Sequence, residues 1–349
     1  MTVSFQLDSM QVNMENETCN PFERLAATHW TLQRTSYVVS EVVIAIFAII
    51  GNILVFLVFF RESKLRHKIN FYIISLAIAD FGIGMIGIPF GISVLSIGLP
   101  YHCSPFLCVV PISSLLTFCN TSVYSLVLIS VKRLRILAMN HPKPKTKSIK
   151  NISKEIGMCW LIGFLIGFLP TIWTGDTDSE CALLNVLSKG FIIFRFIFVV
   201  IIPSIIMFVV YFNIYKIIIT QSQKTYKPDE MRKQKAMNRE IRVTISISMI
   251  VLIYCLTWLP LQLVYLISAL CKSCNAKKFI TLTVCIAHLS SAINPMLYAY
   301  HMRDIRHAIF RLFRSDVSEN LTSVRKSSVM RSESNARSLR VVSLSIVDK

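Results

Sequence analysis

The chain has 349 residues, of which 54% are hydrophobic and 16% are charged, and its mean hydropathy is +0.58. This composition is too apolar for a water-soluble globular domain and indicates a membrane protein. Lysine and arginine outnumber aspartate and glutamate by 37 to 19, which gives a net charge of +18. Because the long apolar runs hold few charges, this excess must lie between them. The first 30 residues contain no such run, so we expect no cleaved signal peptide.

Seven apolar runs are long enough to cross a bilayer as helices, since about 20 residues of helix span its hydrocarbon core. The sequence therefore predicts an all-α membrane fold, a bundle of seven transmembrane helices within residues 37–300. The expected spans are 37–60, 70–97, 106–131, 155–175, 190–219, 242–270 and 279–300.

The segments between the spans predict the orientation of the chain. Residues 61–69, 132–154 and 220–241 are rich in lysine and arginine, and such segments remain in the cytoplasm. With seven spans, the N-terminal segment 1–36 is then extracellular, and we expect a multi-pass protein of the plasma membrane. The acceptor motif that begins at Asn16 is predicted to be glycosylated on this segment.

Two further segments follow the last span. Residues 301–314 place apolar side chains near one helical face and arginines elsewhere, which predicts a short amphipathic interfacial helix on the inner leaflet. Residues 315–349 are rich in serine and arginine and have few large apolar residues, so we expect a disordered cytoplasmic tail.

Polar side chains inside a membrane are costly, so each one indicates a functional site. Several of them, with tryptophan and proline positions, resemble the motifs of the rhodopsin-like (class A) G-protein-coupled receptors over residues 37–314. The matching residues are Asn52, Asp80, Ser122, Trp160, Pro203, Trp258, Pro260, Asn294, Pro295 and Tyr298. This resemblance implies a receptor, not an enzyme, that binds a ligand outside the cell and activates a heterotrimeric G protein inside it.

The same resemblance implies a polar pocket that holds an allosteric sodium ion. Its expected members are Asp80, Ser122, Ser290 and Asn294. A buried carboxylate such as that of Asp80 needs hydrogen-bond donors or a cation, and this pocket would supply them. The alternative is that ordered water alone surrounds Asp80.

The resemblance also implies a G-protein switch at the inner ends of the helices. The family's Asp-Arg-Tyr motif departs here, because Lys132 stands before Arg133, and Glu240 is the expected resting-state partner of Arg133. Tyr211 and Tyr298 are the expected active-state partners. Lys132 would repel Arg133 and weaken the resting state, which predicts high basal activity. Poor coupling, as in a non-signalling decoy receptor, is the alternative.

Two ligand classes lose their anchors in this sequence. Leu115 stands where aminergic receptors carry the aspartate that pairs with amines, and His288 stands where opsins carry the lysine that holds retinal. His288 and Glu41 instead resemble the histidine and glutamate that vertebrate adenosine receptors place between their seventh and first helices. We therefore predict an adenosine-receptor-like chain.

The predicted ligand pocket departs from that branch where adenosine receptors hold the purine. Tyr265 replaces an asparagine, Leu183 replaces a phenylalanine and Gln262 replaces a histidine. Without these groups, discrimination for adenine is expected to fall by orders of magnitude, so adenosine is not the predicted ligand. The predicted ligand-binding residues are Glu41, Leu115, Leu116, Cys119, Asn120, Leu183, Arg195, Trp258, Leu261, Gln262, Tyr265 and His288.

Arg195 interrupts the apolar fifth span, eight residues before Pro203. Facing the pocket, its guanidinium would pair with an anionic group of the ligand. The alternative is that the side chain extends to the outer headgroups of the bilayer.

Six cysteines lie in the segments that the orientation places outside. The resemblance implies a disulfide between Cys108 and Cys181, and Cys271 and Cys274 are expected to close a small ring. Cys19 and Cys103 remain. They form a further disulfide with each other, bond another molecule, or stay as free thiols.

The predicted function is thus a receptor for an extracellular small molecule with an altered adenosine-receptor-like pocket. A receptor for an amine-like, lipid or anionic ligand, and a constitutively active or decoy receptor, are the alternatives. A transporter is not expected, since no inverted repeat is found. The expected partners are the ligand, a G protein, membrane lipids and, at the serine-rich tail, a receptor kinase and arrestin; no nucleic acid partner is expected.

Overall fold

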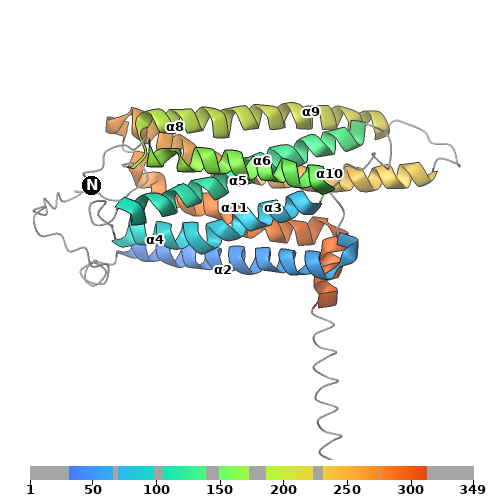
Figure 1. Ribbon diagram of the computed structural model, residues 1–349, viewed down its shortest axis with the longest axis horizontal. Coiled ribbons are helices and arrows are strands. Elements are labelled where there is room, and N and C mark those ends of the chain that lie inside the picture. The colour runs from blue at the N-terminus through green and yellow to red at the C-terminus, as the bar shows by residue number, and fades with distance from the viewer. Residues whose placement is uncertain are drawn as a thin grey trace, which may run out of the picture.

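The computed structural model describes residues 31–65, 70–97, 105–138, 149–172, 186–222, 231–274 and 276–312. Within these residues, seven helices are long and apolar enough to cross a membrane. Figure 1 shows the helices packed side by side along one common direction. The predicted fold class, an all-α bundle of seven transmembrane helices, is confirmed.

Five spans are single helices and two contain a π-helical segment. The first, third, fourth, sixth and seventh spans are α2 (Leu32–Arg61), α5 (Pro105–Ala138), α6 (Ile149–Phe168), α10 (Met231–Leu270) and α11 (Ile280–His301). The second span consists of α3 (Asn70–Gly82), η3 (Ile83–Gly87) and α4 (Ile88–Ile97). The fifth consists of α8 (Lys189–Arg195), η6 (Phe196–Ile201) and α9 (Ile202–Ser222). Short 3-10 turns are η2 (Ser63–Leu65), η5 (Leu169–Thr171), η8 (Lys272–Cys274) and η9 (Ala276–Phe279).

Three helices extend well past the predicted spans at one end of the bundle. The helix α5 continues to Ala138, α6 begins at Ile149 and α10 begins at Met231, so residues predicted to lie in connecting segments are helical. Lysine and arginine favour helix, and the helices therefore continue past the apolar core of the membrane. We call this end, where α2, α5 and α11 finish and α6 and α10 begin, the basic end, and the other the opposite end.

Both π-helical segments lie just before a proline. Proline lacks a backbone donor, and its ring crowds the carbonyl group four residues earlier. For Pro203 that residue is Val199, within η6, and for Pro89 it is Met85, within η3. The wider π turn accommodates this crowding and rotates the residues before it relative to those after it. The direction of Arg195, the last residue of α8, is set in this way.

Large apolar side chains cover the outside of the bundle. Phe47, Leu165 and Phe208 are among the exposed ones, and they lie on α2, α6 and α9. A protein in water rarely exposes an apolar surface of this extent. Lipid is therefore the solvent for these faces, and the polar side chains lie inside the bundle instead.

Two glycines allow α6 to pack closely on α5. A methyl group added at Gly167 would lie 2.7 Å from the backbone nitrogen of Thr117 and 2.8 Å from its Cα atom. One added at Gly163 would lie 3.1 Å from the backbone nitrogen of Thr121. Helices in a bilayer associate largely through such close packing of small residues, because lipid supplies no hydrophobic drive between them.

A short helix, residues 303–312, follows a break at Met302, where the backbone is extended. In Figure 1 this segment, in red, lies across the basic end of the bundle. Ile305 is buried against the bundle, and Arg311 Nε pairs with Glu62 Oε1 at 3.2 Å, which ties the segment to the end of α2. This position and these contacts fit a helix that lies at the membrane surface.

We expect Gly167→Ala to reduce the free energy of unfolding by about 1–3 kcal/mol, because the new methyl group would overlap the backbone of Thr117. The melting temperature of the purified protein in detergent would measure this effect. Gly157→Ala on the same helix is the control, since a methyl group there would meet no atom within 4 Å. Equal melting temperatures for the two variants would contradict the proposed packing role.

Candidate functional site

A cavity lies between α4, α5, α8, α10 and α11, with an empty volume of about 810 Å³ that includes its open mouth. Most of the predicted ligand-binding residues line it. They are Leu115, Leu116, Cys119, Arg195, Trp258, Leu261, Gln262, Tyr265 and His288. Glu41 and Asn120 are buried but are not among the lining residues, since Glu41 contacts His288 and Asn120 Nδ2 donates to the carbonyl of Gly163 on α6. Leu183 lies outside the described residues.

Sequence reasoning missed six other lining residues. They are Phe90, Gly91, Val94, Ile112, Ile280 and Val284. Helical spacing could have found several of them, because Ile280 and Val284 lie eight and four residues before His288 and so share its face of α11. In the same way, Ile112 lies three residues before Leu115 on α5.

Glu41 and His288 connect α2 to α11 at the wall of the cavity. The Nδ1 atom of His288 lies 2.9 Å from Oε2 of Glu41, and both side chains are buried. The ring of His288 also lies edge-on to the ring of Trp258, with 6.5 Å between centroids. The pair thus fixes the position of the His288 ring beside Trp258, which also lines the cavity.

Arg195 and Gln262 meet inside the same cavity. The Nη1 atom of Arg195 donates a hydrogen bond to Oε1 of Gln262 at 2.6 Å, and both side chains are buried. This contact joins α8 to α10. The side chain of Arg195 therefore points into the bundle rather than toward the bilayer headgroups.

The carboxylate of Asp80 is bonded by donors from α11. Ser291 Oγ donates to one oxygen at 2.9 Å, and Asn294 Nδ2 donates to the other at 2.8 Å. Asn52 Nδ2 bonds the backbone carbonyl of Ser291 at 3.1 Å, which brings α2 into the cluster. The buried hydroxyl of Ser122 on α5 also lies close to the Asp80 carboxylate. An oxygen-rich site built on a carboxylate and hydroxyl groups fits the ligand preferences of a small hard cation.

Ser290, which the resemblance assigns to this cluster, makes its hydrogen bonds elsewhere. Ser290 Oγ accepts a hydrogen bond from Trp258 Nε1 at 2.8 Å and donates to the carbonyl of Ala287. Neighbouring residues on a helix point about 100° apart, so Ser290 faces α10 while Ser291 faces Asp80. The two serines therefore connect Trp258 and Asp80 through adjacent positions of α11.

At the basic end, an ion pair joins α5 to α10. Arg133 Nη1 lies 3.0 Å from Glu240 Oε2, and Arg133 is almost fully buried. Tyr211 on α9 bonds Ser130 Oγ at 3.0 Å, one turn before Arg133. Tyr298 is buried nearer the core, and its hydroxyl has no hydrogen-bond partner in the described chain.

Lys132, which the sequence indicates as a repulsive neighbour of Arg133, has a carboxylate partner of its own. Lys132 Nζ pairs with Glu155 Oε1 on α6 at 2.6 Å, and the hydroxyl of Tyr72 bonds the other oxygen of Glu155. The charge of Lys132 is therefore neutralised by a carboxylate that also joins α3. The expected repulsion within the pair of basic residues is largely cancelled, so it does not argue for high basal activity.

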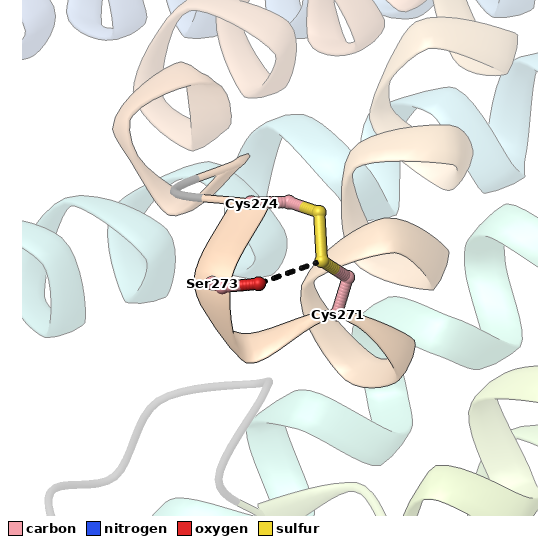
Figure 2. The surroundings of a disulfide bond; sticks show 3 residues. All are labelled: Cys271, Ser273 and Cys274. Atoms are coloured by element: carbon pink, nitrogen blue, oxygen red, sulfur yellow. Dashed lines mark hydrogen bonds between the residues drawn. A yellow bond between two sulfur atoms is a disulfide. The ribbon is translucent and has the colours of Figure 1, made fainter.

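The cysteines of the opposite end are only partly described. Cys271 and Cys274 form a disulfide, with Ser273 Oγ 3.4 Å from the sulfur of Cys271 (Figure 2). Cys108 is buried and disulfide-bonded. Its predicted partner Cys181, together with Cys19, Cys103, the glycosylation site Asn16 and the tail 315–349, lies outside the described residues.

Comparison with known proteins finds one family model, described as the seven-transmembrane receptor (rhodopsin family), that matches residues 51–298. Adenosine receptor A2b of Canis lupus familiaris is 30% identical over 80% of this chain and 90% of the relative. Adenosine receptor A2a of the same species is 28% identical over 80% of this chain and 73% of the relative. Adenosine receptor A3 of Bos taurus is 25% identical over 83% of this chain and 93% of the relative.

We expect Glu41→Leu to destabilise the protein by about 1–3 kcal/mol, because it leaves a buried ring nitrogen of His288 without its partner. The double variant Glu41→Leu/His288→Leu should recover much of this loss, and melting temperatures in detergent would show it. Asp304→Asn, which breaks the exposed pair with Arg239, is the control and should have little effect. Additive losses in the double variant would rule out the coupling.

Proposed function

Because the chain belongs to the rhodopsin family of seven-transmembrane receptors, we propose that it binds an extracellular small molecule in the cavity and activates a heterotrimeric G protein. The observation that carries this proposal is the ion pair between buried Arg133 and partly exposed Glu240, which joins α5 to α10 at the basic end. A ligand at the cavity and a G protein at the basic end would then bias the same two-state bundle.

The proposed orientation puts the basic end in the cytoplasm of a plasma-membrane protein. Its support is the lysine and arginine on that end, which include Arg61, Arg135, Lys150 and Arg303. The cavity then faces the extracellular side.

The helix α10 is the element that we propose to move. It carries Trp258 at the cavity and Glu240 at the basic end, and Pro260 lies between Trp258 and the opposite end. Proline removes one backbone hydrogen bond and makes a helix easier to bend. A ligand that displaces Trp258 would therefore swing the far end of α10 and separate Glu240 from Arg133.

Tyr211 and Tyr298 are proposed to stabilise the open arrangement. Arg133 would lose its carboxylate partner when α10 moves, and a buried guanidinium needs new acceptors. Tyr211 lies on the neighbouring helix α9, bonded to Ser130 one turn from Arg133, and Tyr298 has a free hydroxyl. Both tyrosines are therefore available to Arg133 after a small movement.

We propose that the Asp80 cluster holds a sodium ion. The Asp80 carboxylate and the Ser122 hydroxyl would be its ligands, with Asn294 and Ser291 holding the carboxylate in place. The ion would supply the positive charge that a buried carboxylate otherwise lacks. Ordered water around Asp80 is the alternative.

The likeness to adenosine receptors supports a related scaffold with a different ligand. The Glu41–His288 contact resembles the pair of that branch, and the relatives named above align over most of the chain. However, the cavity is lined by Gln262 and Tyr265 at the positions where that branch holds the purine. We therefore propose an adenosine-receptor-like receptor whose ligand lacks the adenine edge.

The serine-rich tail, residues 315–349, is proposed as the site for a receptor kinase and arrestin. Phosphate groups would reverse the positive charge of this segment and create a docking site. The arginines of residues 303–312 would meanwhile contact anionic lipids of the inner leaflet.

We expect Glu240→Ala to raise ligand-independent G-protein activation about fivefold. Destabilising the resting state by about 1 kcal/mol relative to the active state raises the population of the active state by that factor. Arg133→Ala should abolish activation. Dissociation of Gα from Gβγ, measured by energy transfer in cells at matched surface expression, gives the readout. Asp304→Asn is the control at the same end of the bundle. Unchanged signalling in both test variants would favour a decoy receptor.

Glu155→Gln should raise basal activity two- to fivefold by the same assay, on the order of a 0.5–1 kcal/mol change, because it leaves Lys132 unpaired beside Arg133. Lys132→Gln/Glu155→Gln should return basal activity to the wild-type level, because no unpaired lysine remains. If the double variant stays as active as Glu155→Gln alone, the effect does not pass through Lys132.

A further inference from the structure

The cavity contains a buried positive charge that has no negative partner in the described residues. Arg195 is 6% exposed, and its Nη1 atom bonds the neutral side chain of Gln262. Its Nε atom is buried without a hydrogen-bond partner. Arginine remains protonated in proteins, so the charge itself persists.

The lining residues do not balance this charge. No aspartate or glutamate is among those that the structure gives for the cavity, and His288 is bonded to Glu41 behind the wall. A buried ion without a counter-ion costs several kcal/mol in other proteins, and chains rarely keep one without a use for it.

The other ionised basic groups of the described bundle interior are paired. Arg133 meets Glu240, and Lys132 meets Glu155. Arg195 differs from both, because its strongest contact is with an amide. That amide accepts through its oxygen, which fixes the guanidinium at the cavity, and its nitrogen remains a further donor.

The remaining wall is almost entirely apolar. It is formed by Phe90, Val94, Ile112, Leu115, Leu261 and Val284, among others. Such a wall favours an apolar body, whereas a single guanidinium favours a single acidic group. An amine would be repelled by Arg195, and a nucleotide with several phosphate charges would meet only one cation in the described lining.

We propose that the ligand is a lipophilic monoanion, an apolar molecule with one carboxylate or sulfate group, and that this group pairs with Arg195 beside Gln262. This inference rests on the proposed function, since it names the ligand class of the same cavity. Arg195 is then the specificity-determining residue, and the apolar wall supplies most of the contact area.

The test compares molecules that share one tail and differ only in the head. Dodecanoate, dodecyl sulfate below its micelle concentration, dodecanol and dodecyltrimethylammonium are added to the full-length receptor in phosphatidylcholine nanodiscs, and melting temperatures give apparent affinities. We expect both anions to stabilise the wild type at concentrations at least tenfold lower than dodecanol, and the ammonium compound not to stabilise it. Equal affinities for dodecanoate and dodecanol would overturn the inference.

Two variants distinguish binding of the anion to Arg195 from a non-specific attraction to the positive charge of the protein. Arg195→Gln should weaken both anions by about 10- to 100-fold and leave dodecanol unchanged, which is the loss expected for a charge-assisted hydrogen bond. Lys189→Gln is the matched control, because Lys189 is an exposed cation on the same helix α8. Equal losses in both variants, or none in Arg195→Gln, would contradict the proposal.

Two further arms keep the outcomes distinct. In phosphatidylglycerol nanodiscs without added acid, a stabilisation that depends on Arg195 would assign the anion to a lipid headgroup, and its absence would assign it to a free acid. The Glu240→Ala signalling assay needs no ligand. If Glu240→Ala and Arg133→Ala change signalling as expected but the four head groups bind equally, this inference alone is overturned. If the anions bind preferentially but neither variant changes signalling, the proposed receptor function alone is overturned.

Discussion

The bilayer offers no hydrogen bonds, and this constraint accounts for most of the internal structure. Every polar group at membrane depth must find a partner within the protein or pay a large cost of desolvation. The helices pair the backbone donors and acceptors. Hydrogen bonds that involve the side chains of Asp80, Asn52 and Asn294 connect α2, α3 and α11. Because these bonds cross between helices, they fix how the spans are rotated and how far they are displaced along one another.

The same constraint makes charge the best guide to function in this chain. At the basic end, the two neighbouring cations of α5 each meet a carboxylate from a different helix, α10 for Arg133 and α6 for Lys132. At the cavity, the partner of Arg195 among the described residues is the amide of Gln262. Movement of α10 would break the first arrangement, whereas the second leaves a positive charge that the proposed anionic ligand would balance.

A few direct contacts lead from the cavity toward the basic end. Trp258 lines the cavity and donates to Ser290, and the next residue of α11 donates to Asp80. Trp258 and Glu240 lie on one continuous helix, so the proposed displacement at the cavity would be carried to the basic end. Close packing of α6 on α5 through Gly163 and Gly167 gives this movement a rigid neighbour to act against.

The sequence alone determined the spans, because length and hydropathy are enough to identify helices that must cross a bilayer. It also indicated Glu240 and Glu41 as partners of Arg133 and His288, through the resemblance to rhodopsin-like and adenosine receptors, and the structure pairs both. It did not predict a role for Glu155, the first residue of the expected fourth span, or the choice of Ser291 over Ser290. Lipid-facing and bundle-facing sides of these helices are both apolar, so the hydrophobic pattern does not encode their rotation. Only the packing of helix on helix decides that Arg195 faces the cavity and that Lys132 meets Glu155.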